Sequence, residues 1–204
     1  MRTSDRILDA ALESFSTRGY EATALDAVGA SLGITKQAVL YWYPSKEALF
    51  DAVVLRGAEE LAGVLEAALR QGGHGWARVE AVVRSVFGLA VQRPHLLGLL
   101  REVSRLGSPG AVVFTERMAP LVQRARGFLE GEMAAGRMRR QDPSLLLLSA
   151  YSAVVGTATE VEVMRALGVE PSLRSATRRR RELLAFLRSA LLAEPSGRTA
   201  PSAA

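Results

Sequence analysis

Apolar residues recur along most of this chain at the three- and four-residue spacing of an amphipathic helix. The first such stripe contains Ile7, Leu8, Ala11, Leu12 and Phe15. Alternating β-branched runs between turn residues, which would predict strands, are nearly absent. The pattern therefore predicts an all-α fold.

Turn and capping signals divide the chain into separate helices. Gly19 can end the first helix, and Thr23 with Asp26 forms a Thr-x-x-acid pattern typical of a helix start. Pro120 is expected either to kink or to divide the helix that contains it, and Asp142-Pro143 is a strong start signal. After the first helix, the predicted ranges are about 23–32, 35–43, 46–70, 76–92, 94–107, 111–135, 143–167 and 172–193.

These helices group into two predicted domains. Residues 1–46 hold three short helices, 47–193 hold most of the apolar mass, and 194–204 are expected to form a disordered tail. The chain has 204 residues, of which 49% are apolar and 23% charged, so a disordered or fibrous protein is excluded. No apolar run is long enough for a bilayer and no apolar signal-peptide core follows the polar start, so we expect a cytoplasmic protein.

The positive charge is distributed unevenly. The formal net charge is +5, yet residues 1–50 carry five basic and six acidic side chains. Part of the excess lies in Arg178–Arg181, which we interpret as a solvated run paired with acids such as Glu182. Charge alone would therefore place a nucleic-acid site in the wrong half of the chain.

The arrangement of the first three helices is more informative than the charge. A Gly-containing turn, Gly33-Ile34-Thr35, joins the second helix to the third, which is the layout of a helix-turn-helix. The third helix presents Lys36 and Gln37 near its start, where such side chains can bond to base edges in the major groove. Helix packing without DNA binding would produce the same pattern.

Two stretches of this region resemble the DNA-binding domain of TetR-family regulators. The first runs from Arg6 to Leu12 and continues with Phe15, Gly19, Tyr20 and Thr23, and the second runs from Gly33 to Leu49. Together they cover about fifty residues, a quarter of the chain. The sequence departs from the family pattern at Gly29, a weak helix former, and at Tyr43, which stands in place of the usual Phe.

The resemblance implies a sequence-specific transcriptional regulator, a repressor that a small-molecule ligand releases from a palindromic operator. Double-stranded DNA, a second copy of the chain and an apolar or amphipathic effector are the implied partners. The residues expected to contact DNA are Thr23, Thr35, Lys36, Gln37, Ala38, Val39, Tyr41, Tyr43 and Lys46. Trp42 is expected to lie in the core or at the junction with the second domain.

The larger domain is expected to dimerise and to enclose a ligand cavity. Apolar residues of the last two helices are the dimer candidates: Val154, Ala158, Val161, Leu183, Leu184, Leu187 and Leu191. The pocket candidates are Phe87, Val91, Leu100, Phe114, Met118, Tyr151, Val155 and Thr159. An ordinary monomer core would use the same residues.

Enzyme chemistry has little support. The chain has no cysteine, only two histidines and no Gly-rich phosphate loop, so we expect no catalytic residue, metal site or cofactor. Two alternatives stay open: a dimeric DNA-binding regulator without a small-molecule ligand, and a helical interaction protein that does not bind DNA.

Overall fold

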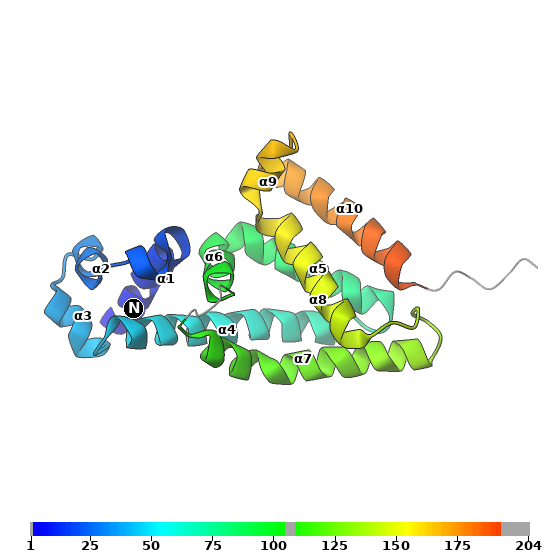
Figure 1. The fold of residues 1–204 in the computed structure, drawn as a ribbon, viewed down its shortest axis with the longest axis horizontal. Coiled ribbons are helices and arrows are strands. Elements are labelled where there is room, and N and C mark those ends of the chain that lie inside the picture. Colours follow the sequence, from blue (N-terminus) through cyan, green and yellow to red (C-terminus); the bar gives the residue numbers. More distant parts are fainter. Residues whose placement is uncertain (1, 105–108, 193–204) are drawn as a thin grey trace, which may run out of the picture.

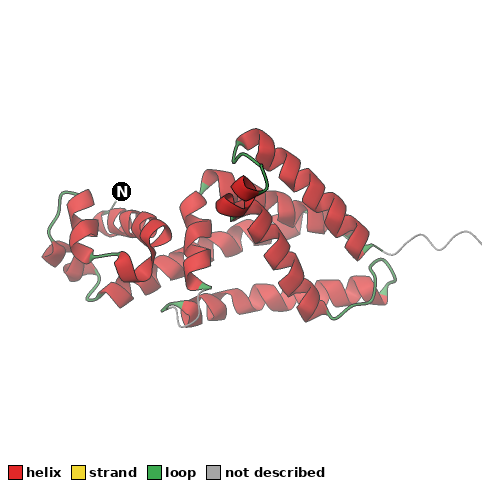
Figure 2. Ribbon diagram, turned by 45° about the horizontal axis from the view of Figure 1, so that its top comes forward, coloured by secondary structure: helices red, strands yellow, loops and turns green. Residues whose placement is uncertain are grey.

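The computed structural model describes residues 2–104 and 109–192, which form ten α-helices and no strand. Figure 1 shows α1–α3 gathered at one end of an elongated molecule, with α4 running from them along the rest. The helices are α1 (Thr3–Ala22), α2 (Leu25–Ser31), α3 (Lys36–Trp42), α4 (Lys46–Gln71), α5 (Trp76–Gln92), α6 (Pro94–Val103), α7 (Ala111–Ala134), α8 (Pro143–Thr159), α9 (Val161–Ala166) and α10 (Leu173–Leu191). Figure 2 shows the same helices joined by short loops.

The N-terminal core combines the first three helices with two later ones. The apolar stripe predicted for α1 is buried: Ile7, Ala11 and Phe15 have no solvent exposure. It packs against α2, α3, the first half of α4, and Leu99 and Val103 of α6. Four residues of α4 belong to this core: Leu49, Phe50, Val53 and Val54. The core therefore extends past residue 46, where the sequence pattern places the domain boundary.

The rest of the chain is built around the second half of α4. Ala58, Leu61 and Ala62 of this helix pack with α5, α6 and α7. A separate cluster joins α5, α8 and α10, and a smaller one surrounds Met133 near the end of α7. Because α4 contributes to both the N-terminal core and the central one, it connects the two parts of the molecule.

Two local predictions differ from the structure. Thr23 does not cap α2, because its hydroxyl donates to the carbonyl of Gly19 at 2.8 Å and Ala24 occupies the cap position. The helix predicted over 143–167 ends at Thr159, where Arg101 of α6 binds the freed carbonyl at 2.7 Å. Of the two outcomes expected at Pro120, division is excluded, because α7 continues through it, and a kink stays a prediction. The predicted tail at 194–204 lies outside the described residues.

An ion pair between the buried Glu132 and the exposed Arg137 lies at the C-terminal end of α7. Glu132 is 5% exposed, and Arg137 donates two hydrogen bonds to its carboxylate at 2.6 and 3.0 Å. These hydrogen bonds, against the opposing effect of burial, hold the pKa of Glu132 below its usual value, with Arg137, His74 and Arg78 adding favourable charge. The pair therefore stabilises the fold above the ordinary carboxyl pKa, and this contribution is lost as pH falls through the lower folded pKa.

We expect Glu132→Gln to lower the melting midpoint at pH 7 by roughly 3–10 °C, because a charge-assisted pair in a buried position is lost. The difference from the unsubstituted chain should shrink below about pH 4, where protonation removes the same contribution. Glu130→Gln is the matched control, since Glu130 pairs with Arg126 on the exposed face of the same helix. Thermal melts followed by circular dichroism measure both, and equal midpoints for the two variants would contradict a stabilising pair.

Candidate nucleic-acid interface

The turn between α2 and α3 depends on a close backbone approach. The amide of Ile34 donates to the carbonyl of Gly29 at 3.0 Å. A Cβ atom at Gly29 would lie 2.8 Å from the carbonyl oxygen of Ile34, closer than real Cβ contacts allow. The weak helix former noted in the sequence is thus required by packing. Gly33 supplies the positive φ of 69° at which the chain leaves α2.

Helix α3 presents one face to solvent and buries the other. The Thr35 hydroxyl caps the helix by accepting from the amide of Ala38 at 3.2 Å. Val39 is completely buried, and Gln37 and Tyr41 lie four residues apart on the opposite face. Tyr41 is 82% exposed, which is unusual for an aromatic ring without a partner surface. The outward face of α3 thus presents the Gln37 amide and the Tyr41 phenol to solvent, where both are accessible to a partner as large as a DNA duplex.

Lys36 adds positive charge to this face. Its ammonium lies 3.1 Å from the carboxylate of Asp26, and both side chains are substantially exposed. An exposed pair of this kind contributes only about 0–1 kcal/mol. Lys36 can therefore exchange Asp26 for a phosphate or a base edge at little cost.

Two other predicted contacts are engaged within the domain. Lys46 donates to the carbonyl of Glu21 at 3.0 Å, and its ammonium lies 4.4 Å from the centre of the Tyr20 ring. The Tyr43 hydroxyl donates to the carbonyl of Ser4 at 3.5 Å, and burial raises the pKa of this phenol. Both side chains hold α3 and α4 against α1.

Burial corrects three of the sequence interpretations. Thr23 is 2% exposed and Val39 is fully buried, so neither can touch DNA. Trp42 is 46% exposed and meets the Tyr41 ring edge-on at 5.6 Å, so it is not a core residue. The sequence reasoning missed Trp42 as a surface residue, although its place between two tyrosines at the end of the recognition helix was a possible signal.

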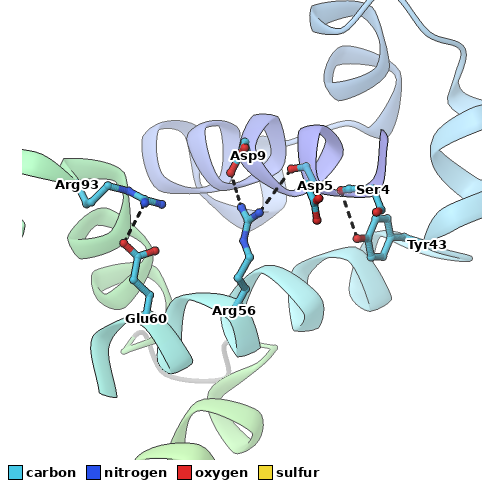
Figure 3. A network of polar contacts seen from close by, with 7 residues as sticks. All are labelled: Ser4, Asp5, Asp9, Tyr43, Arg56, Glu60 and Arg93. Atoms are coloured by element: carbon cyan, nitrogen blue, oxygen red, sulfur yellow. Dashed lines mark hydrogen bonds and ion pairs between the residues drawn. The ribbon is translucent and has the colours of Figure 1, made fainter. Parts of the chain in front are cut away.

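A polar network fixes α1 on α4 (Figure 3). Arg56 of α4 donates to the carboxylate of Asp9 at 2.7 Å and to the carbonyl of Asp5 at 3.5 Å. One turn further along α4, Glu60 pairs with Arg93 at the junction of α5 and α6 at 2.9 Å. The Asp9 carboxylate therefore faces α4, which reduces its repulsion of a DNA backbone near α3.

Helix α6 forms a second contact with α1. Glu102 accepts from the backbone amide of Tyr20 at 2.9 Å, just after the interruption of α1 at Gly19. Ser16 and His95 are joined by a side-chain hydrogen bond of 2.9 Å. A Cβ atom at Gly98 would lie 2.9 Å from the Cβ of Ser16, so the two helices touch closely. Movement of α6 would therefore displace α1 and the helices packed on it.

The predicted ligand pocket is almost filled. A cavity of about 10 Å³ remains between α4, α6 and α7, with Leu100 and Phe114 among its lining residues. This space is near the minimum for one water molecule. Phe87 belongs instead to the cluster of α5, α8 and α10, and Met118 and Val155 pack in the central cluster.

Like Phe87, Met118 and Val155, the remaining three pocket candidates do not line this cavity. Val91 is 47% exposed, so its assignment to a pocket was wrong. Tyr151 is also exposed and lies 3.4 Å from the Ser104 hydroxyl. The Thr159 hydroxyl donates to the carbonyl of Val155. The structure does not gather the predicted pocket set around one space.

The predicted dimer residues are mostly internal. Val154, Leu183, Leu187 and Leu191 are buried against α5, so they cannot contact a second chain. Leu184 and Ala158 are half-buried beside them, whereas Val161 is exposed. The large apolar side chains of α8 that face solvent include Leu145 and Leu148, at 63% and 60% exposure, besides Tyr151. On α8, these exposed leucines lie on a different side of the helix from the buried Val154.

Together, a three-helix unit with a tight α2–α3 turn, an exposed α3 and a large helical body defines a DNA-binding transcription regulator of the helix-turn-helix class. The family model described as bacterial regulatory proteins, tetR family, matches residues 7–53. The comparisons support a TetR-family transcriptional regulator, with the match to the family's DNA-binding domain at residues 7–53.

Individual relatives agree with this assignment. The chain is 26% identical to the regulator RutR of Escherichia coli over 147 residues, which are 72% of this chain and 69% of RutR. It is 36% identical over 50 residues to IcaR of Staphylococcus aureus, a negative regulator of a biofilm operon, covering 24% of this chain and 27% of IcaR. A putative regulator from Saccharomonospora viridis, solved in complex with choline, has the same fold, with a TM-score of 0.75 at 17% identity over 94% of this chain and 98% of that one.

Across residues 2–104 and 109–192, no helix combines the length and the apolar character needed to cross a bilayer.

Proposed function

We propose that this chain acts as a homodimeric repressor whose hold on a two-fold symmetric operator is weakened by a small molecule. The observation that carries the proposal is the outward face of α3, where Gln37 and Tyr41 are exposed and Lys36 is held only by a surface ion pair. IcaR is named as a negative regulator, and the fold relative from Saccharomonospora viridis holds choline. Both support repression and ligand response in the proposed function.

The proposed division into two domains separates the helices that bind DNA from those that form the regulatory unit. The DNA-binding unit, predicted as residues 1–46, is proposed to use the first half of α4 as its base, and the regulatory unit occupies the rest through α10. Two copies place two α3 helices about one DNA turn apart, which is how a dimer reads a two-fold site. The contacts of α6 with Ser16 and Tyr20 supply a route by which a ligand-stabilised conformation changes that spacing.

Selection from pooled random duplexes tests this proposal. We expect the chain to retain a two-fold symmetric sequence, with affinity that falls steeply as salt increases because phosphate contacts release counterions. Binding that vanishes at modest salt and enriches no sequence would instead favour the helical interaction protein. Retention of one half-site alone would contradict the dimer.

Two substitutions on α3 test which side chains read the DNA. Gln37→Ala should weaken the selected operator about 5- to 150-fold and relax preference at one base position, because an amide bonds to base edges. Tyr41→Ala should weaken binding to all duplexes by a similar factor, because a phosphate contact carries no sequence information. Gln123→Ala, on the exposed surface of α7, is the matched control. Unchanged affinity in both α3 variants would remove this face from the interface.

A further inference from the structure

Helix α1 is interrupted shortly before its end at Ala22. Gly19 has a φ of 83° and a ψ of 169°, which lie outside the helical region. A residue with a side chain rarely adopts such a φ, so the interruption depends on glycine. The backbone amides that follow a break of this kind lose their helical acceptors and need others. Tyr20 carries the first of these amides.

Glu102 of α6 supplies the acceptor that this amide needs. Its carboxylate accepts from the Tyr20 amide at 2.9 Å. A Cβ atom at Gly19 would lie 3.4 Å from the nearer carboxylate oxygen, so the carboxylate lies directly over the break. A hydrogen bond to an ionised acceptor is stronger than one between neutral groups. A side chain from beyond the first four helices therefore completes a helix of the DNA-binding unit.

Apolar contacts fix α6 in the position that this hydrogen bond requires. Leu99 and Val103 are buried in the N-terminal core, in the same cluster as Phe15 of α1. Leu99 lies three residues before Glu102, so the two side chains share the face of α6 that meets α1. Figure 1 shows α6 beside α1. The carboxylate is thus held by a packed helix and not by a loop.

The Tyr20 side chain connects the break in α1 to the start of α4. Its ring packs on Phe15 and Phe50, whose ring centroids are 5.9 and 4.9 Å away. The Lys46 ammonium lies 4.4 Å from the centre of the Tyr20 ring and donates to the carbonyl of Glu21 at 3.0 Å. Lys46 begins α4, and only three residues separate it from the end of α3. A shift of Tyr20 would therefore move the junction at which α3 meets α4.

We propose that Glu102 is a positioning residue for operator binding. By holding the Tyr20 amide it fixes the end of α1, and through Tyr20 and Lys46 it fixes the junction of α3 with α4. Glu102 acts in this way without touching DNA, and the DNA-binding unit is incomplete without α6. The inference rests on the proposed function for its effect on operator affinity, whereas the link from Glu102 to α3 can be measured without DNA.

Charge alone gives the opposite expectation for the removal of Glu102. A carboxylate repels the DNA backbone, so removing one should raise the affinity for every duplex slightly. A role in stability alone would lower the melting midpoint and leave the operator affinity of the folded chain unchanged. A loss of operator affinity well below the melting midpoint therefore separates positioning from both.

Three substitutions at Glu102 separate its acceptor from its charge. Glu102→Ala removes both and should weaken binding of the selected operator at least about tenfold. Glu102→Asp keeps the charge but withdraws the acceptor by one methylene, so it should weaken binding at least about threefold even if the alanine variant folds poorly. Glu102→Gln keeps an acceptor at the same reach and should stay within about threefold of the unsubstituted chain. Glu116→Ala, on the exposed surface of α7, is the control for the loss of one negative charge.

Amide hydrogen exchange measures the link to α3 without DNA. We expect residues 36–46 to exchange at least about tenfold faster in Glu102→Ala than in the unsubstituted chain, and Glu102→Gln to restore most of the protection. Unchanged exchange over these residues, or an operator affinity that is unchanged or higher in both Glu102→Ala and Glu102→Asp, would overturn the proposal. If the unsubstituted chain selects no operator but the exchange responds as expected, the proposed function fails and the link from Glu102 to α3 stands.

Discussion

Gly29→Ala should remove most operator binding, at least about a hundredfold, while the larger helical body stays folded. The added Cβ would meet the carbonyl oxygen of Ile34 at 2.8 Å, and that neighbour is backbone, which cannot rotate away. The α2–α3 turn must open, at a cost typical of overpacking, about 1–3 kcal/mol. Because several α3 contacts must reach DNA together, and each is worth about 1–3 kcal/mol, a displaced helix loses more than one of them.

Gly88→Ala provides the control for this result. Gly88 also lies inside a helix, but a Cβ atom there has open space around it. Replacing a helical glycine at such a position should leave operator affinity unchanged and stabilise the fold by about 0.5–1 kcal/mol. Operator titrations and thermal melts of both variants give the comparison. If Gly29→Ala bound the operator like the unsubstituted chain, the close approach in the turn would not control α3.

If the proposed homodimer forms through α8, substituting glutamate for both Leu145 and Leu148 is expected to convert the chain to a monomer and reduce operator affinity at least about a hundredfold. These exposed leucines lie three residues apart on α8, so they form one patch that the chain itself leaves uncovered. Four glutamates facing one another across a two-fold axis would repel. A monomer would also lose the gain from binding two half-sites at once.

Sedimentation at micromolar concentration measures the mass of each variant against the 21.9 kDa chain. Val112→Glu is the control, because Val112 is 69% exposed on α7 and lies outside the proposed α8 interface. It should leave both the dimer and the operator affinity intact. A Leu145→Glu, Leu148→Glu chain that still sediments as a dimer would place the interface elsewhere.

The contrast between Val39 and its neighbours explains why site residues were harder to predict than helices. The pattern correctly predicted a helix after Gly33 with Thr35 as its cap. It did not distinguish the side of α3 that packs on α1 from the side that faces solvent, because a seven-residue helix has too few apolar positions to define a stripe. Val39 was predicted to contact DNA and is fully buried, whereas Trp42 was predicted in the core or at the junction with the second domain and is 46% exposed.

Helix α10 of the larger domain is a second case in which the helix was predicted but the surroundings of its side chains were not. The spacing of Leu183, Leu187 and Leu191 correctly predicted an amphipathic helix. Periodicity reports that one face is apolar and says nothing about whether the same chain or a second copy covers it. Here α5 covers it, through Val83, Val86 and Phe87. Val91 is exposed for a related reason, since it lies at the end of α5 beyond the surface that its neighbours cover.

By itself, the sequence determined the all-α class, most helix bounds and the helix-turn-helix, because these depend on local spacing, caps and turn residues. Only the tertiary structure decided the need for Gly29, the engagement of Lys46 and Tyr43 with α1, and the closed central cavity. It also brought the Arg179 guanidinium of α10 to the backbone carbonyl of Thr157 in α8. Each of these results from segments distant in sequence meeting in space, where burial and close approach depend on both surfaces at once.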